Sequence, residues 1–259
     1  MAEKENGQEL KELAQTLLQI GALLMSSGAN SQRIRKTLHR IAGEFQCHID
    51  LLITHRALML NISDAQKQHF YSAIKRTEPV GVNFKIVSGI SRMSWRLVQE
   101  HWSIAQLKKE LDGLLSLTHY PRIVILLMVG LAGASFCRLF GGEWLDMVVT
   151  FSATFIGLVV RQEVTKRSFN PYLCIFFAAF TSSLIAGFPV VYFDVIHEQA
   201  LFSAVLYLIP GVPLINSFSD LIHGETMTGI VRSVNGLLIA FSIALGFMLA
   251  TKICELYLI

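Results

Sequence analysis

The chain has 259 residues and a formal net charge of +3; 53% of its residues are hydrophobic and 16% are charged. An average soluble domain carries about 25% charged residues, so this composition favours a membrane protein. The small net charge, without a Lys/Arg cluster interleaved with aromatic residues, argues against nucleic acid as a partner. Residues 1–7 are polar and of mixed charge. They lack the apolar core of a signal peptide and therefore indicate a cytosolic N-terminus.

Charge is distributed unevenly along the chain. Residues 1–118 are charge-rich, whereas residues 119–259 contain long apolar runs with few charges. The pattern predicts a soluble N-terminal α+β domain over 1–118, followed over 119–259 by a membrane all-α bundle of about five transmembrane helices.

The soluble domain is expected to place helices beside a small antiparallel sheet. Leu10, Leu13 and Leu17 recur at helical spacing, and Gly28 marks the expected end of that helix. Short apolar runs then indicate strands, with a hairpin turn at 63–67. In chain order, the expected elements are a helix over 8–28, a second helix capped by Asn30 or Ser31, strands over 48–54, 57–62 and 68–73, and helices over 83–100 and 103–115.

The sequence gives little support for metal binding or for catalysis. His48, His55 and His69 all fall in the predicted sheet and could converge on a metal, but their spacing matches no ligand motif. The four cysteines form no C-x-x-C pair and are expected to be small buried hydrophobic residues. We find no catalytic triad order, phosphate loop or zinc-protease motif. The sequence therefore predicts no catalytic residue, no metal and no cofactor.

Five apolar segments approach the length needed to cross a bilayer, whose hydrocarbon core is about 30 Å thick. The second of them is the shortest. They cover residues 121–140, 144–160, 171–190, 199–219 and 229–251.

Loop charges predict the orientation of these segments. Arg161, Lys166 and Arg167 lie between the second and third spans, whereas the next loop holds Asp194 and Glu198 without any Lys or Arg. The positive-inside rule therefore places the loop between the second and third spans in the cytosol. The soluble domain is then also cytosolic. Five crossings put the C-terminus on the outer side of the membrane.

Two charged residues flank the short connection between the first two spans. Arg138 and Asp146 could pair across Gly141-Gly142. One interpretation is an interfacial salt bridge that closes a tight hairpin. The other is a charged gate or substrate contact, because buried charges in membranes often mark transport pathways.

The fourth span contains the sequence Pro210-Gly211-Val212-Pro213. Proline removes a backbone donor and clashes with the preceding turn, so the helix cannot run unbroken here. Broken helices are a recurrent device of transporters, and a half-helix beginning at Pro213 would direct its positive end at an anion. The alternative is a kink that only shapes packing.

Polar residues follow the break. Asn216 and Asp220 share a face of the fourth span, and Arg232 and Asn235 share a face of the fifth. Arg232 suits a carboxylate, because its planar fork can bind one through two hydrogen bonds. The alternative is that Arg232 anchors the helix at the cytosolic interface. We therefore take Arg232, Asn216, Asp220, Asn235 and Arg138 as candidate substrate-binding residues.

Several short sequence motifs along the chain occur together in one known family. They are Gly28 to Ser31, Tyr120 to Arg122, Leu127 to Leu131, Phe136 to Leu139, Gly141-Gly142 with Trp144, Arg161-Gln162, Pro210 to Asn216 with Asp220, and Thr228-Gly229 with Arg232. Together they resemble the threonine/serine exporter family over nearly the whole chain.

The resemblance implies export of small carboxylates. Members with one long chain have about ten spans, whereas this chain has about five. It therefore resembles the large subunit of the split form, in which a small polytopic membrane subunit supplies the other spans. The implied substrates are a C4-dicarboxylate such as succinate, or threonine and serine. Without an ATP-binding motif, an ion or substrate gradient is expected to drive transport.

Two other classes of function stay open. The first is a membrane-anchored ligand sensor without transport activity, although several polar residues inside the spans argue against it. The second is a membrane-embedded enzyme, for which the chain offers no nucleophile–base pair or metal-ligand set.

Overall fold

A computed structural model describes residues 2–77, 81–116, 120–193 and 198–256. The chain forms two compact units, and each combines two separate stretches of sequence. The sheet unit consists of Met1–Thr118 with Gly211–Val234, and the helical unit consists of His119–Pro210 with Asn235–Ile259. The sheet unit thus takes in a stretch of the chain far beyond the predicted N-terminal domain.

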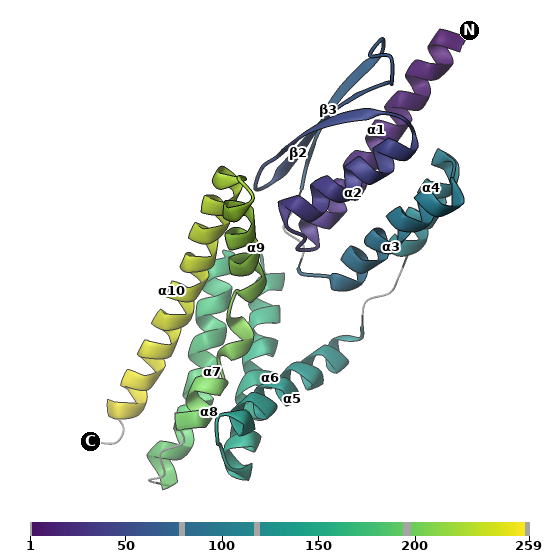
Figure 1. Ribbon diagram of the computed structural model, residues 1–259. Coiled ribbons are helices and arrows are strands. Elements are labelled where there is room, and N and C mark those ends of the chain that lie inside the picture. The colour runs from purple at the N-terminus through teal and green to yellow at the C-terminus, as the bar shows by residue number, and fades with distance from the viewer. Residues whose placement is uncertain (1, 78–80, 117–119, 194–197, 257–259) are drawn as a thin grey trace. The chain divides into compact units, whose positions relative to one another are not determined.

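Two helices pack on one face of the sheet in the sheet unit (Figure 1). Helix α1 (Ala2–Ser26) ends at Gly28, whose positive φ of 91° completes a Schellman motif. In that motif the N–H of Ala29 donates to the carbonyl of Leu24 at 3.0 Å. Helix α2 (Ser31–Glu44) follows at once. Its N-cap is Asn30, one of the two residues expected to cap it, whose side chain accepts from the N–H of Arg33.

The sheet is antiparallel with strand order β1-β2-β3. Its strands are β1 (His48–Ile53), β2 (Ala57–Ser63) and β3 (Phe70–Arg76). The turn between β2 and β3 is longer than the sequence indicated, and β3 begins at Phe70 rather than at residue 68. The cause is the Asp64 carboxylate, which accepts from the N–H of Gln68 at 2.8 Å and lies 2.9 Å from the His69 ring.

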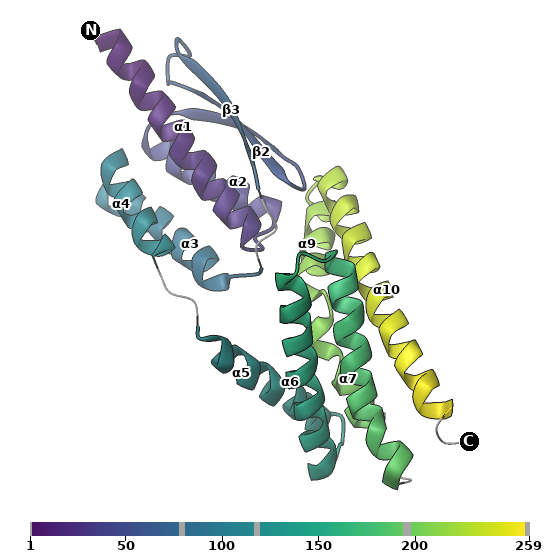
Figure 2. The same cartoon turned by 180° about the vertical axis from the view of Figure 1, so that it is seen from behind.

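The core of the sheet unit lies between the sheet and α1 and α2, and it continues to a further layer (Figure 2). That layer consists of α3 (Phe84–Glu100) and α4 (Ile104–Leu115). The side chains of Asn83 and Ser103 cap these two helices, so both begin where polar capping residues predict. The fully buried side chains of the core include Leu13, Leu17, Ile20, Leu24, Ile34, Leu38, Ile41, Leu58, Leu60, Ile62, Ile90 and Leu97.

Apolar helices build the helical unit. They are α5 (Arg122–Leu139), α6 (Trp144–Lys166), α7 (Pro171–Phe193), the short α8 (Glu198–Ser203), a 3-10 turn (Leu206–Leu208) and the later part of α10 (Thr226–Leu256). Small residues line the contacts of α6, α7 and α8, which is typical of helix packing in membranes. The fully buried examples are Ala153, Ala186, Ala200 and Ala204.

Four helices in the described part of the chain are long and apolar enough to cross a membrane: α5, α6, α7 and α10. The count rises to five if the pair of segments Glu198–Leu208 and Gly211–Ile222 forms one broken span. The protein is therefore a multi-pass membrane protein. The second predicted span is longer than expected, because α6 continues to Lys166.

Helix α10 is longer than a bilayer requires. At about 1.5 Å per residue, its 31 residues extend for roughly 46 Å, compared with a hydrocarbon core of about 30 Å. Its first residues, 226–234, belong to the sheet unit. Residues 235–256 alone extend for roughly 33 Å, which is enough for one crossing.

Helix α10 approaches the backbone of α7 closely at Gly246. A Cβ added there would lie 2.6 Å from the carbonyl oxygen of Phe176 and 2.9 Å from the backbone nitrogen of Phe180. Because both contacts are backbone atoms, a Gly246→Ala variant is expected to lose about 1–3 kcal/mol of stability. Thermal unfolding in detergent would measure the loss.

A matched control is Gly113→Ala in α4, where the added Cβ would have no neighbour within 4 Å. That variant should keep or slightly raise the unfolding temperature. An unchanged unfolding temperature in Gly246→Ala would contradict the close approach of the two helices.

Candidate functional site

Asp220 and Arg232 form a buried ion pair in the sheet unit. Arg232 Nη1 donates to Asp220 Oδ2 at 2.6 Å, and the two side chains are only 10% and 1% exposed. Asp220 lies in α9 (Gly211–Ile222), and Arg232 lies near the start of α10. A buried pair of this kind persists only when hydrogen bonds satisfy the remaining polar atoms.

The second oxygen of Asp220 is also occupied. Asp220 Oδ1 accepts from the backbone N–H of Ser31 at 3.0 Å. Ser31 is the first residue of α2, so the carboxylate lies at the positive end of that helix. Asp220 therefore holds Arg232 with one oxygen and caps α2 with the other.

The turn between α1 and α2 contacts α9 through two more hydrogen bonds. Asn216 Nδ2 donates to the carbonyl of Gly28 at 2.7 Å, and Asn30 Nδ2 donates to Ser219 Oγ at 3.1 Å. The partners are 188 and 189 residues apart in sequence. The two motifs that carried much of the family resemblance thus meet in one interface.

Two further contacts hold the start of α10 and the residues before it. Thr228 Oγ1 donates to the carbonyl of Ile53, the last residue of β1, at 3.0 Å. Arg35 of α2 forms an ion pair with Glu225. These contacts fix the position of Arg232 relative to the sheet.

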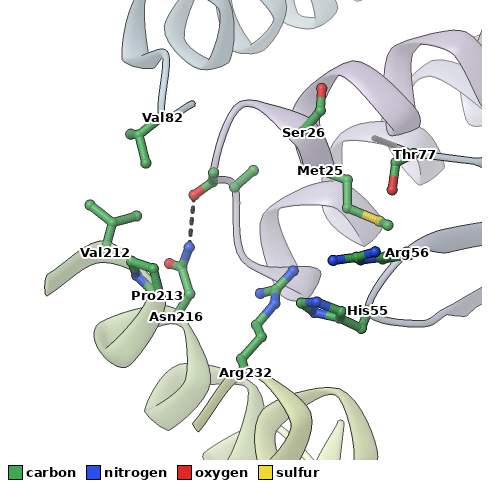
Figure 3. A pocket seen from close by; sticks show the side chains of 12 residues that line it. Met25, Ser26, His55, Arg56, Thr77, Val82, Val212, Pro213, Asn216 and Arg232 are labelled. Atoms are coloured by element: carbon green, nitrogen blue, oxygen red, sulfur yellow. Dashed lines mark hydrogen bonds between the residues drawn. The ribbon is translucent and has the colours of Figure 1, made fainter. Parts of the chain in front are cut away.

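A pocket of about 200 Å³ opens beside Arg232 (Figure 3). Three of its lining side chains are basic or can become so: His55, Arg56 and Arg232. None of its twelve described lining residues is acidic. The lining residues are Met25, Ser26, Gly28, Ala29, His55, Arg56, Thr77, Val82, Val212, Pro213, Asn216 and Arg232.

The environment of His55 in this pocket affects the pKa of its imidazole. Burial lowers the pKa of His55, and the nearby charges of Arg56 and Arg232 lower it further. His55 is therefore expected to be neutral at pH 7.

The first turn of α9 lines the same pocket. The predicted break is confirmed, because Ile209 is extended and α9 begins after Pro210. The half-helix begins at Gly211, however, rather than at Pro213. Pro213 fits inside the first turn, where backbone N–H groups have no partner within the helix. Val212 and Pro213 thus bring the positive end of α9 to the pocket.

The other two candidate residues belong to the helical unit. Asn235 Oδ1 accepts from the Tyr172 hydroxyl at 2.6 Å. Arg138 Nη1 donates to the carbonyl of Gly142 at 3.1 Å. Asp146 Oδ2 accepts from the N–H of Glu143 at 2.7 Å and thereby helps to cap α6.

Arg56 is not among the candidate residues predicted from the sequence, and His55 was predicted only as a possible metal ligand. Among the described residues, no group of three His, Cys, Asp or Glu side chains could hold a metal ion. His55 and Arg56 lie in the short turn between β1 and β2. The sequence held one indication that these residues could form part of a site. Two basic residues between adjacent strands project from the end of a hairpin.

Several helices that are long and apolar enough to cross a membrane, together with a broken helix, are typical of membrane transporters. Comparison with known proteins identifies the kind of transporter. The chain belongs to the threonine/serine exporter family, because a family model described as "Putative threonine/serine exporter" matches residues 15–254.

Relatives in three bacteria cover nearly the whole chain. The "Probable succinate transporter subunit YjjP" of Klebsiella aerogenes is 26% identical over 246 residues, which are 93% of this chain and 94% of that protein. The protein of the same name in Escherichia coli is 26% identical over 252 residues, 95% of this chain and 96% of that protein. The "Threonine/serine exporter" of Corynebacterium glutamicum is 23% identical over 253 residues, 92% of this chain but 50% of that protein. No solved structure matches.

The family and these names support an exporter role and a non-enzymatic transporter.

Proposed function

We propose that this chain is one subunit of a secondary exporter that moves small carboxylates out of the cytosol. The observation that carries the proposal is the position of Arg232, which lines a pocket whose described residues include no acidic side chain while Asp220 holds its guanidinium. Arginine offers five N–H donors, so it can keep Asp220 as a partner and still bind a substrate carboxylate.

The remaining candidates have distinct roles in this proposal. Asn216 and the first turn of α9 add polar and dipolar attraction for an anion at the same pocket. Asp220 positions Arg232 and is not itself a substrate contact. Asn235 and Arg138 would serve the path through the membrane, where polar side chains are costly unless they serve a function.

A second membrane subunit is part of the proposal. The word "subunit" in the names of two relatives, and the match to only 50% of the C. glutamicum exporter, both support a half-transporter. A small polytopic partner in the lipid bilayer would supply the remaining spans. Alternating access would then occur around the break at Pro210, driven by a gradient.

The proposed location is a bacterial inner membrane with the sheet unit in the cytosol. Arg161, Lys166 and Arg167 at the end of α6 support this orientation through the positive-inside rule. The C-terminus would lie in the periplasm.

Efflux from proteoliposomes tests the proposal. Liposomes that contain the chain and its partner are loaded with labelled succinate or threonine, and Arg232→Ala is compared with the unaltered protein. We expect Arg232→Ala to abolish most efflux, because it removes the fork that binds the carboxylate. Arg33→Ala, which removes an exposed arginine of α2, should export normally.

The position of the pocket also favours a second candidate, a ligand sensor, because all twelve lining residues lie in the sheet unit. The efflux assay, combined with a measurement of succinate binding, separates the two. An Arg232→Ala variant that inserts normally and exports at the unaltered rate, but no longer binds succinate, would favour the sensor and refute the exporter site.

A further inference from the structure

Arg56 has a fixed position at the end of the β1–β2 hairpin. The N–H of Thr54 donates to the carbonyl of Ala57 at 2.9 Å, and the N–H of Ala57 donates to Thr54 Oγ1 at 3.0 Å. The carbonyl of Arg56 accepts from the N–H of Thr77 at 2.9 Å. These bonds hold the turn, and the Arg56 side chain extends from it toward the pocket (Figure 3).

The two arginines of the pocket differ in how their charge is balanced. Arg232 has Asp220 as its counter-ion. Arg56 has no ion pair within the described residues, and no described lining residue is acidic. Among the described residues, the pocket therefore carries about one positive charge from Arg56 that no acidic side chain balances, together with roughly half a charge from the first turn of α9. A bound anion would balance both.

We propose that Arg56 binds the second carboxylate of a dicarboxylate whose first carboxylate is bound by Arg232. This inference rests on the proposed function and specifies its substrate class. It also gives the N-terminal part of the chain a direct role, because Arg56 comes from the sheet and Arg232 from α10. A volume of about 200 Å³ suits a short diacid better than a drug-sized ligand, which needs about 300–1,000 Å³.

The same charges disfavour an amino acid. Threonine and serine carry an ammonium group, which requires acceptors and is repelled by a nearby guanidinium. None of the described lining residues offers a carboxylate, which would be the strongest partner for an ammonium group. Arg56 thus becomes the residue that selects a dicarboxylate over an amino acid or a monocarboxylate.

Calorimetric titration of the purified full chain in lipid nanodiscs tests this role. The probes are succinate, butyrate as a monocarboxylate of the same length, and threonine. In Arg56→Gln, the affinity for succinate should fall by about tenfold to a hundredfold, because a charge-assisted contact is lost. The affinity for butyrate should change by less than about threefold, and Arg56→Lys should restore part of the succinate binding.

Arg76→Gln is the matched control, because Arg76 is an exposed arginine that pairs with Ala57 in the same sheet but does not line the pocket. It should bind succinate like the unaltered chain. Arg56 is exposed, so its replacement is not expected to unfold the protein, and the unfolding temperature checks this.

Equal succinate affinity in Arg56→Gln and the unaltered chain would overturn the inference, while the exporter proposal would survive if Arg232→Ala still abolished efflux. An unaltered chain that exports threonine but does not bind succinate would also overturn it. Failure of the unaltered protein and its partner to export either substrate would instead refute the proposed function itself.

Discussion

Asp220→Asn is expected to lower the stability of the sheet unit by about 3–5 kcal/mol, because it leaves the buried charge of Arg232 without its counter-ion. The same change weakens the cap on α2, because an amide carries no charge to offer the Ser31 N–H. Trp102 lies in the sheet unit and is 7% exposed, so the tryptophan fluorescence of the full chain in nanodiscs would report unfolding of that unit.

Asp112→Asn provides the control, because Asp112 is exposed in α4 and its replacement should change stability by less than about 0.5 kcal/mol. The double variant Asp220→Asn/Arg232→Gln should be destabilised by less than the sum of the single variants, since the two residues interact directly. Additive losses, or a stable Asp220→Asn variant, would contradict a structural role for this ion pair.

The parts of the fold that could be predicted from the sequence are those that depend on local features such as helix caps, glycines and prolines. Asn83 and Ser103 begin α3 and α4 as polar capping residues should, and Gly28 ends α1 because a positive φ is needed there. The prolines around Gly211 marked the break in the fourth span. Each of these features depends on chemistry within a few residues, which a single sequence displays.

The candidate site depends on contacts that no local pattern contains. Ser31 and Asp220 are 189 residues apart, so the sequence could not indicate that the carboxylate caps α2. Asp220 was expected to contact substrate or to couple transport to protons, whereas the structure gives both of its oxygens protein partners. The substrate-binding role of Arg232 stays a prediction until transport is measured.

Arg56 was missed for a related reason. A basic residue in a hairpin turn is usually solvated, and only the tertiary structure places this turn beside the start of α10. The first turn of α9 was expected to direct its positive end at an anion, and it does line the pocket that contains Arg56 and Arg232. The prolines alone predict a helix start that could face an anion. They do not predict that Arg56 and Arg232 lie in the same pocket as this helix start.

A reporter fused after residue 256 is expected to lie on the opposite side of the membrane from one fused near the N-terminus. Residues 1–118 and 211–234 belong to one compact unit joined by buried contacts, so we expect both stretches to lie on the same side. The chain between them must therefore cross the membrane an even number of times. If α5, α6 and α7 each cross once, we expect the segment that contains α8 to provide the fourth crossing.

This fourth crossing is short, since residues 198–210 would extend for only about 20 Å as a helix. Such a segment is tolerated where protein surrounds it, and α8 contacts α5, α6 and α7. Helix α10 then makes a fifth crossing. Paired fusions to alkaline phosphatase, active in the periplasm, and to a cytosolic fluorescent protein measure the outcome. Both termini on one side would mean four crossings and would require the contacts of Asp220 and Thr228 with the N-terminal part of the chain to be absent in the membrane.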